Sequence, residues 1–161
     1  MPTVSESTLR DMLVGIYSAK GASAEEAETV ARHQVGANLV GHDSHGIMRT
    51  RGYVDLIDKG HIVPGAPYEV ERSSATSAVI NGNWGFGFVV TERAMTETIE
   101  KAKEAGVAMA AVRYQGHVGR LGAYAAMGYT DVIVRHLAED QSDVLESFAR
   151  LARVRESLLE A

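Results

Sequence analysis

Apolar and polar residues recur at helical spacing through the first part of the chain. The apolar positions of the first segment are Leu9, Met12, Leu13 and Ile16. Positions three or four residues apart lie on one face of a helix, so this pattern predicts an amphipathic helix. Ser5 or Ser7 is suited to cap its beginning, and Gly21 is suited to end it.

A second and a third helix are expected to follow. Ser23 and Glu26 have the spacing of a capping box, so a helix begins there and ends before Gly41. Its apolar residues are Ala27, Val30, Ala31 and Val35. The third helix is expected to begin near Ile47 and to end at Gly60.

The pattern then changes to short segments of mixed structure. Residues 64–67 hold two of the three prolines of the chain and predict a turn. Residues 68–72 and 75–80 are rich in strand-forming residues and are bounded by turn residues, so each predicts a short strand. The sequence Asn-Gly-Asn at residues 81–83 predicts a further turn.

A long helix is expected to end at Gly106, followed by a strand and a glycine-rich loop. Residues 107–112 are a run of small apolar residues, which predicts a strand buried on both faces. Glycines at every third position of residues 116–122 then lead into a short Ala-rich helix. The expected fold class is mixed α/β, with a helical segment (residues 1–60) before a layered βα region (residues 61–125).

The pattern at the end of the chain predicts one more βα unit. Residues 130–134 predict a buried strand, and an amphipathic helix is expected from Asp140 onward. Two interpretations of residues 126–161 are open. They are an appended unit of separate origin, or a divergent βα unit of the same domain.

Composition and charge narrow the class of protein. A chain of 161 residues with 45% hydrophobic residues can bury one core. The net charge of −5 and the lack of a basic block make nucleic acid an unexpected partner. The N-terminus lacks the features of a signal peptide, and no apolar run reaches the roughly 18 residues of a membrane span. We expect a cytoplasmic protein with no membrane partner.

The densest group of reactive side chains is His42-Asp43-Ser44-His45-Gly46. Arg49, Arg51 and Tyr53 follow it. The two histidines with Asp43 could bind a metal, but a more distant ligand is missing, and we expect no metal site. Ser44 as a nucleophile lacks a Gly-x-Ser-x-Gly turn. Asp43 and Ser44 are also good helix caps, which is the structural alternative.

The second group lies at residues 116–122, directly after the predicted strand. A glycine loop between a strand and a helix is a common place for anions and cofactors. The spacing Gly-x-x-Gly-x-x-Gly is not the dinucleotide fingerprint of a Rossmann fold. His117 has a pKa near neutrality and is suited to acid–base chemistry in such a loop. The alternative is that the glycines serve packing and His117 has no chemical role.

These motifs together resemble a known family. In chain order they are Gly41-His42-Asp43-Ser44-His45-Gly46 with Arg49 and Tyr53, Gly60-x-Ile62-x-Pro64, Asn81-Gly82-x-x-Gly85-x-Gly87, and His117-Val118-Gly119-Arg120-Leu121-Gly122-x-Tyr124. Over residues 5–125 the chain resembles the type 2 malate/L-lactate dehydrogenases, which include ureidoglycolate and sulfolactate dehydrogenases and cyclic-imine reductases. The resemblance implies a non-Rossmann fold, an NAD or NADP cofactor and a homodimer. Because family members are roughly twice as long, it also implies a truncated chain lacking most of the cofactor domain.

The resemblance also implies roles for individual residues. His117 matches the acid–base position, and Ser44 and His45 match a pair near the reacting carbon. Arg49 and Tyr53 are expected to bind the substrate carboxylate. The positions expected at the cofactor are Gly119, Arg120 and Leu121. The implied reaction is hydride transfer between a nicotinamide and a small 2-hydroxy, 2-oxo or imino acid.

Two further expectations concern the rest of the chain. Residues 128–137 with the following helix resemble the end of luciferase-like flavin or deazaflavin monooxygenases. Absence of the remaining family segments should leave apolar surface on residues 107–112, which favours a homo-oligomer, most simply a dimer.

A non-catalytic interaction module is the alternative function. A flavin-linked fragment is disfavoured because the tail lacks a phosphate-binding loop.

Overall fold

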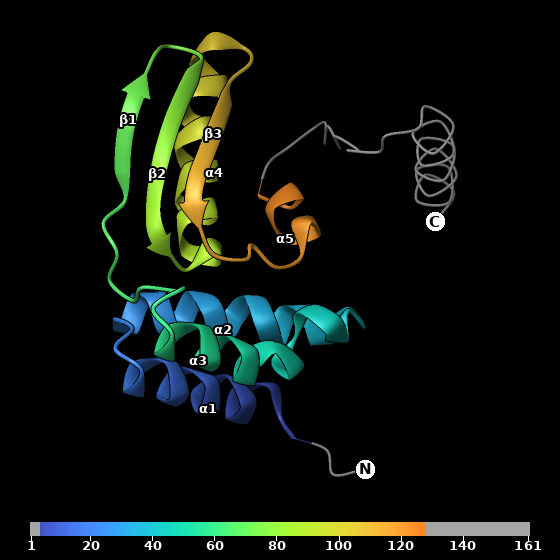
Figure 1. Cartoon of the computed structure of the whole chain (residues 1–161). Coiled ribbons are helices and arrows are strands. Elements are labelled where there is room, and N and C mark those ends of the chain that lie inside the picture. Colours follow the sequence, from blue (N-terminus) through green and yellow to red (C-terminus); the bar gives the residue numbers. More distant parts are fainter. Residues whose placement is uncertain (1–3, 128–161) are drawn as a thin grey trace, which may run out of the picture. The chain divides into compact units, whose positions relative to one another are not determined.

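The N-terminal part of the chain is helical, as expected. The structure is a computed structural model that describes residues 4–127 (Figure 1). Helix α1 (Glu6–Ala19) packs against helix α2 (Ala24–Leu39). Ser5 caps α1, and Ser23 forms a reciprocal capping box with Glu26 at the start of α2. The prediction of both helices and of their N-caps is confirmed.

The third helix begins later than predicted. Two short 3-10 turns, η1 (Asp43–His45) and η2 (Ile47–Arg49), precede helix α3 (Thr50–Asp58). The predicted start at residue 47 therefore falls in η2. The Arg49 N–H bonds to the carbonyl of Gly46, three residues earlier, at 3.0 Å, which is the tighter 3-10 pattern.

A small open sheet with helices follows. Strand β1 (Glu69–Ser73) pairs antiparallel with β2 (Ser77–Gly85), and β2 pairs parallel with β3 (Met109–Gln115). Helix α4 (Gly87–Ala105) connects the two parallel strands and packs on both. The short helix α5 (Leu121–Ala125) comes after the glycine-rich loop. The mixed α/β class is confirmed.

The prediction of a strand buried on both faces is wrong. The strand begins at residue 109, and its residues are exposed or half-buried. The order of strands is β1-β2-β3, so within residues 4–127 β3 lies at an edge of the sheet. Val107 is 71% exposed and Met109 66% exposed, so the expected apolar surface is present in this region.

The predicted turn at residues 81–83 is also wrong, because β2 continues to Gly85. Asn83 and Trp84 adopt left-handed conformations there, with φ of 46° and 62°. The Asn81 Oδ1 accepts the Asn83 N–H at 3.0 Å, and pairing then resumes between Gly85 and Gln115. The turn residues produce an irregularity inside the strand rather than its end.

The buried side chains form two groups. The larger one unites the three helices with the start of α4, and its largest members are Tyr17, Tyr53, Phe86 and Phe88. The smaller one lies between the sheet and α4, at Ala78, Ile80, Val90 and Ala94. The start of α4 therefore links the helical layer to the sheet.

The strand and helix predicted within residues 130–161 lie outside the described residues. Within residues 4–127, no helix has both the length and the apolar character that crossing a membrane requires.

Candidate active site

Two loops bring the predicted site residues together. The polar loop (residues 42–49) joins α2 to α3, and the glycine loop (residues 116–120) joins β3 to α5. The ring centroids of His45 and His117 lie 5.3 Å apart, and the rings of His117 and Tyr53 lie 6.1 Å apart. Residues more than 60 positions apart in the sequence thus form one group.

His117 is held at one ring nitrogen. Its Nδ1 lies 2.7 Å from the hydroxyl of Tyr53 and accepts the backbone N–H of Gly119 at 3.2 Å. An N–H donor at Nδ1 places the lone pair there, so the neutral ring carries its hydrogen on Nε2. Among the described residues, Nε2 of His117 has no hydrogen-bond partner. It is therefore the nitrogen that can meet a ligand.

The Tyr53 side chain that contacts His117 is itself held in place by packing. Its side chain is 1% exposed and packs edge-to-face on Phe88, with ring centroids 5.6 Å apart. Burial raises the pKa of the Tyr53 hydroxyl, and the nearby Arg49 opposes that rise. The hydroxyl therefore stays protonated at neutral pH and is able both to donate and to accept a hydrogen bond.

The polar loop contributes a serine and two histidines to the same group. The Ser44 hydroxyl lies 3.1 Å from Nδ1 of His45, and the ring of His42 lies 4.3 Å from that of His45. Desolvation and the charges of His42 and Arg49 lower the pKa of His45. Desolvation, with the charges of His45 and Arg49, likewise lowers the pKa of His117. Both rings are therefore mainly neutral at pH 7.

Arg49 gives the site its positive charge. It is exposed, and its guanidinium lies 5.9 Å from the centre of the Tyr53 ring. Within residues 4–127, it forms no ion pair with a carboxylate. A planar guanidinium without a protein carboxylate is suited to bind an incoming one.

The glycine loop is fixed by close packing. Gly119 has a φ of +76°, and a Cβ on it would lie 2.2 Å from Cε1 of Phe88. The Tyr124 hydroxyl donates to the carbonyl of Val118 at 2.6 Å. The packing interpretation therefore holds for Gly119, because Phe88 occupies the space that a side chain would need. It does not exclude a chemical role for His117, which Gly119 also positions.

Arg120 carries a donor without a partner. Its Nε is buried and has no hydrogen-bond partner among the described residues. A buried, unsatisfied N–H is costly unless a ligand accepts from it. The residue lies at the end of the glycine loop, so this donor is a candidate contact for an anionic group.

The helix-cap interpretation of Asp43 and Ser44 is wrong. The residues that precede η1, η2 and α3 are His42, Gly46 and Arg49, and none makes a side-chain cap hydrogen bond. Asp43 instead accepts from Asn38 at 2.5 Å, while Ser44 contacts His45. In the part of the chain that is described, no group of three or more His, Cys, Asp or Glu residues could hold a metal ion.

Three residues that hold the loops were not singled out in the sequence. Gln34 and Asn38 contact the polar loop, and Phe88 contacts the glycine loop. Gln34 and Asn38 are four positions apart, beside the apolar stripe of α2, so two polar residues on an inward face were the available signal. No signal in the sequence separates Phe88 from other aromatic residues of the core.

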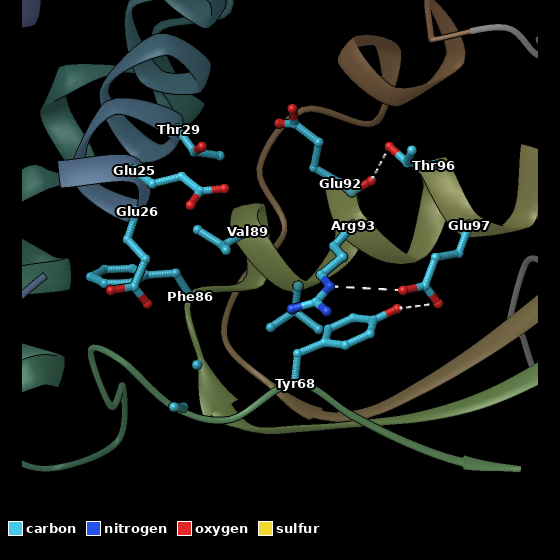
Figure 2. Close-up of a pocket in the computed structure, with 13 residues that line it drawn as sticks. Glu25, Glu26, Thr29, Tyr68, Phe86, Val89, Glu92, Arg93, Thr96 and Glu97 are labelled. Atoms are coloured by element: carbon cyan, nitrogen blue, oxygen red, sulfur yellow. Dashed lines mark hydrogen bonds and ion pairs between the residues drawn. The ribbon is translucent and has the colours of Figure 1, made fainter. Parts of the chain in front are cut away.

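A separate cleft of about 590 Å³ lies beside the N-terminal parts of α2 and α4 (Figure 2). Arg93 lies over the Tyr68 ring at 4.1 Å and pairs with Glu97 at 3.7 Å, as Figure 2 shows. None of the residues predicted for the active site lines this cleft. The group of reactive side chains is therefore at the two loops, away from the cleft.

Comparisons with known proteins identify relatives. A sequence model of the malate/L-lactate dehydrogenase family matches residues 4–146. Hydroxycarboxylate dehydrogenase B of Escherichia coli O157:H7 is 34% identical over 118 residues, which are 73% of this chain and 33% of that protein. Malate/(S)-sulfolactate dehydrogenase of Methanothermus fervidus is 37% identical over 124 residues, 77% of this chain and 37% of that protein.

The fold is shared with solved members as well. The malate dehydrogenase of Pyrococcus horikoshii superposes with a TM-score of 0.76 at 35% identity, over 78% of this chain and 36% of that structure. The matched part of this chain thus covers about a third of each relative. The family match passes residue 125, and the resemblance of the following segment to luciferase-like enzymes stays a prediction. By sequence and by fold, the chain belongs to the malate/L-lactate dehydrogenase family.

Proposed function

We propose that the two loops form the catalytic part of a 2-hydroxyacid dehydrogenase, which exchanges a hydride between NAD or NADP and a small 2-hydroxy, 2-oxo or imino acid. The observation that carries the proposal is the position of His117. Its Nδ1 is held by Tyr53 and Gly119, while its Nε2 has no partner among the described residues. The relatives named above are dehydrogenases of malate, sulfolactate and hydroxycarboxylates. Malate and sulfolactate each have a carboxylate next to a hydroxyl-bearing carbon.

His117 is the proposed proton carrier. In the oxidative direction, the ring hydrogen first moves from Nε2 to Nδ1, where the oxygen of Tyr53 accepts it. Nε2 then has the lone pair that takes the proton of the substrate hydroxyl. In the reductive direction, it returns that proton to the carbonyl oxygen. The Tyr53 hydroxyl, 2.7 Å from Nδ1, donates when Nδ1 has a lone pair and accepts when Nδ1 carries a hydrogen. Tyr53 thereby stabilises the ring in either protonation state.

The polar loop orients the substrate. Arg49 binds the carboxylate through charge-assisted hydrogen bonds. The Tyr53 hydroxyl donates to the same carboxylate when Nδ1 of His117 carries a hydrogen, because its own hydrogen is then free. Ser44 and His45 lie beside His117, where they polarise the substrate oxygen or pass a proton to solvent. One loop thus provides the binding charge, and the other provides the proton carrier.

The cofactor is proposed to lie against Gly119, Arg120 and Leu121. When bound, it supplies the hydride chemistry. The buried Nε of Arg120, which has no partner within residues 4–127, fits an anionic group such as a nucleotide phosphate. The packing of Gly119 against Phe88 already explains why this position is a glycine, so Gly119 gives no separate support for a cofactor site. Arg120 is the residue of this loop that supports cofactor binding best.

A homodimer is part of the proposal. Val107 and Met109 expose apolar side chains at the start of β3, which is an edge strand of the sheet within the described residues. Exposed apolar surface of this kind favours association. Sedimentation at micromolar concentration should show a dimer, and a clean monomer would contradict this part of the proposal.

The same exposed edge favours a second candidate, a non-catalytic interaction module that pairs with another subunit. The two candidates differ in cofactor binding. The test is a titration of the chain with NADH and with NADPH, followed by nicotinamide fluorescence. Saturable binding of either supports the dehydrogenase, and binding of neither leaves the interaction module.

A further inference from the structure

The polar loop has little apolar anchoring. Neither η1 nor η2 contains a buried side chain. Ile47 is 38% exposed and Met48 is 74% exposed, so the apolar side chains of this loop do not pin it to the core. Because a proton-transferring group must be held closely in place, contacts other than apolar packing have to fix the loop.

Asn38 provides two such contacts from the last turn of α2. Its Oδ1 accepts the backbone N–H of Ile47 at 2.9 Å, and its Nδ2 donates to Oδ1 of Asp43 at 2.5 Å. The two bonds fix which way the amide faces, since a flipped amide would put its oxygen against the carboxylate. Asn38 thereby holds both sides of His45 along the chain.

The backbone of the loop also lies unusually close to this amide. A Cβ on Gly46 would lie 2.2 Å from Oδ1 and 2.5 Å from Cγ of Asn38. Gly46 has a φ of −89°, so glycine is required here for space and not for backbone conformation. A side chain at residue 46 would push the amide away and break both of its hydrogen bonds.

Gln34, one turn earlier on α2, adds a third contact. Its side chain is 0% exposed, and its Nε2 donates to the carbonyl of Gly46 at 3.3 Å. Its Oε1 accepts from Tyr17 at 2.8 Å and from Thr50 at 3.4 Å. Gln34 therefore ties the polar loop to α1 and to the start of α3.

We propose that Asn38, supported by Gln34, is a positioning residue that holds His45 opposite His117. The geometric part of this inference stands on the contacts above. Its catalytic consequence rests on the proposed function. Asn38 touches no substrate in this account and acts through the Asp43 side chain and the Ile47 backbone, which lie on either side of His45 in the chain.

The decisive variants exchange the two partners of one bond. Asn38→Ala removes both bonds. Asn38→Asp with Asp43→Asn keeps the volume and the net charge, and it restores a donor–acceptor pair in the opposite direction. Gly36→Ala is the control on the same helix, because a Cβ there meets nothing within 4 Å.

The readout is the electrostatic coupling of the two histidines, measured by NMR titration of the imidazoles. The charge of His45 contributes to the lowered pKa of His117, so His45→Gln should raise the pKa of His117. We expect that rise to shrink in Asn38→Ala, to return in the exchanged pair, and to be unchanged in Gly36→Ala. An equal rise in the parent chain and in Asn38→Ala would overturn the proposal. If Asn38→Ala does not fold, Asn38→Asp alone replaces it and should lose the coupling that the exchanged pair regains.

Kinetics give the second readout. For the turnover of a 2-oxo acid with NADH or NADPH, Asn38→Ala should lower kcat/KM by about 10²-fold, the usual cost of misplacing a catalytic group by about 1 Å. The exchanged pair should recover most of this loss. A parent chain that binds no nicotinamide cofactor refutes the proposed function, while the pKa coupling still decides the role of Asn38.

Discussion

The polar loop and the glycine loop meet at one site but are held by different forces. The polar loop is exposed and is fixed by hydrogen bonds from Gln34 and Asn38. The glycine loop is fixed by close packing, with Gly119 pressed against Phe88. A hydrogen-bonded loop tolerates substitutions that keep donors and acceptors, whereas a packed loop tolerates none that add volume. The predictions below use this difference.

The largest expected effect is on turnover, in the glycine loop. If His117 carries the proton, His117→Ala should lower kcat by about 10²–10⁴-fold while substrate binding changes little. Steady-state kinetics in both directions measure this. The matched change in the polar loop is His45→Ala, which should cost less. Near-normal turnover of His117→Ala with loss of activity in His45→Ala would assign the base to His45 instead.

A second prediction compares one glycine from each loop. Gly119→Ala adds a methyl group against Phe88, at a cost of about 1–3 kcal/mol, and its positive φ adds about 1–2 kcal/mol more. Gly46→Ala displaces only the Asn38 side chain, so it should destabilise less. Thermal unfolding of the two variants gives the comparison. Equal losses of stability would mean that the polar loop is packed as rigidly as the glycine loop.

Arg49 should show the opposite kinetic bias to His117. Arg49→Ala removes a charge-assisted hydrogen bond to the substrate carboxylate, worth about 1.5–3 kcal/mol, and should appear mainly as a higher KM. Arg49→Lys keeps the charge but loses the planar pair of donors, so it should recover part of the affinity. A fall in kcat with an unchanged KM would remove Arg49 from the carboxylate site.

The smallest effect concerns pH and stability. The pKa values of His33, His45 and His117 are lowered in the fold, for His33 mainly by burial, which the contact with Glu92 opposes. Protonation therefore favours the unfolded chain. Stability should be fully present above the ordinary histidine pKa of about 6.5 and should fall as the pH drops below it. Urea unfolding across this range measures the fall, and His33→Gln should make it shallower. Stability that rises on acidification there would contradict these shifts.

Much of the fold could be predicted because it depends on local signals. The capping box at Ser23 and the glycine after α4 each act within a few residues, and both predictions are confirmed. The burial of β3 could not be predicted in this way. An apolar run does not say whether a strand has neighbours on both sides, and β3 lies at an edge of the described sheet.

The candidate site could likewise be predicted only in part. His45, Arg49, Tyr53 and His117 were named from their motifs, and the structure brings them into one group. Their roles stay predictions. The residues that hold them were missed because Asn38 acts through space on the next loop, and no local spacing encodes that contact.

The central claim is that the fold presents Nε2 of His117 to a ligand while Tyr53 and Gly119 hold Nδ1. Long-range ¹H–¹⁵N NMR of the imidazole tests it most directly, because the nitrogen shifts report which atom carries the hydrogen. We predict the Nε2–H tautomer at neutral pH, with a pKa below the ordinary histidine value. In Tyr53→Phe, the shift of Nδ1 should change while the Gly119 contact remains. An Nδ1–H tautomer, or a pKa at or above the ordinary value, would contradict the account.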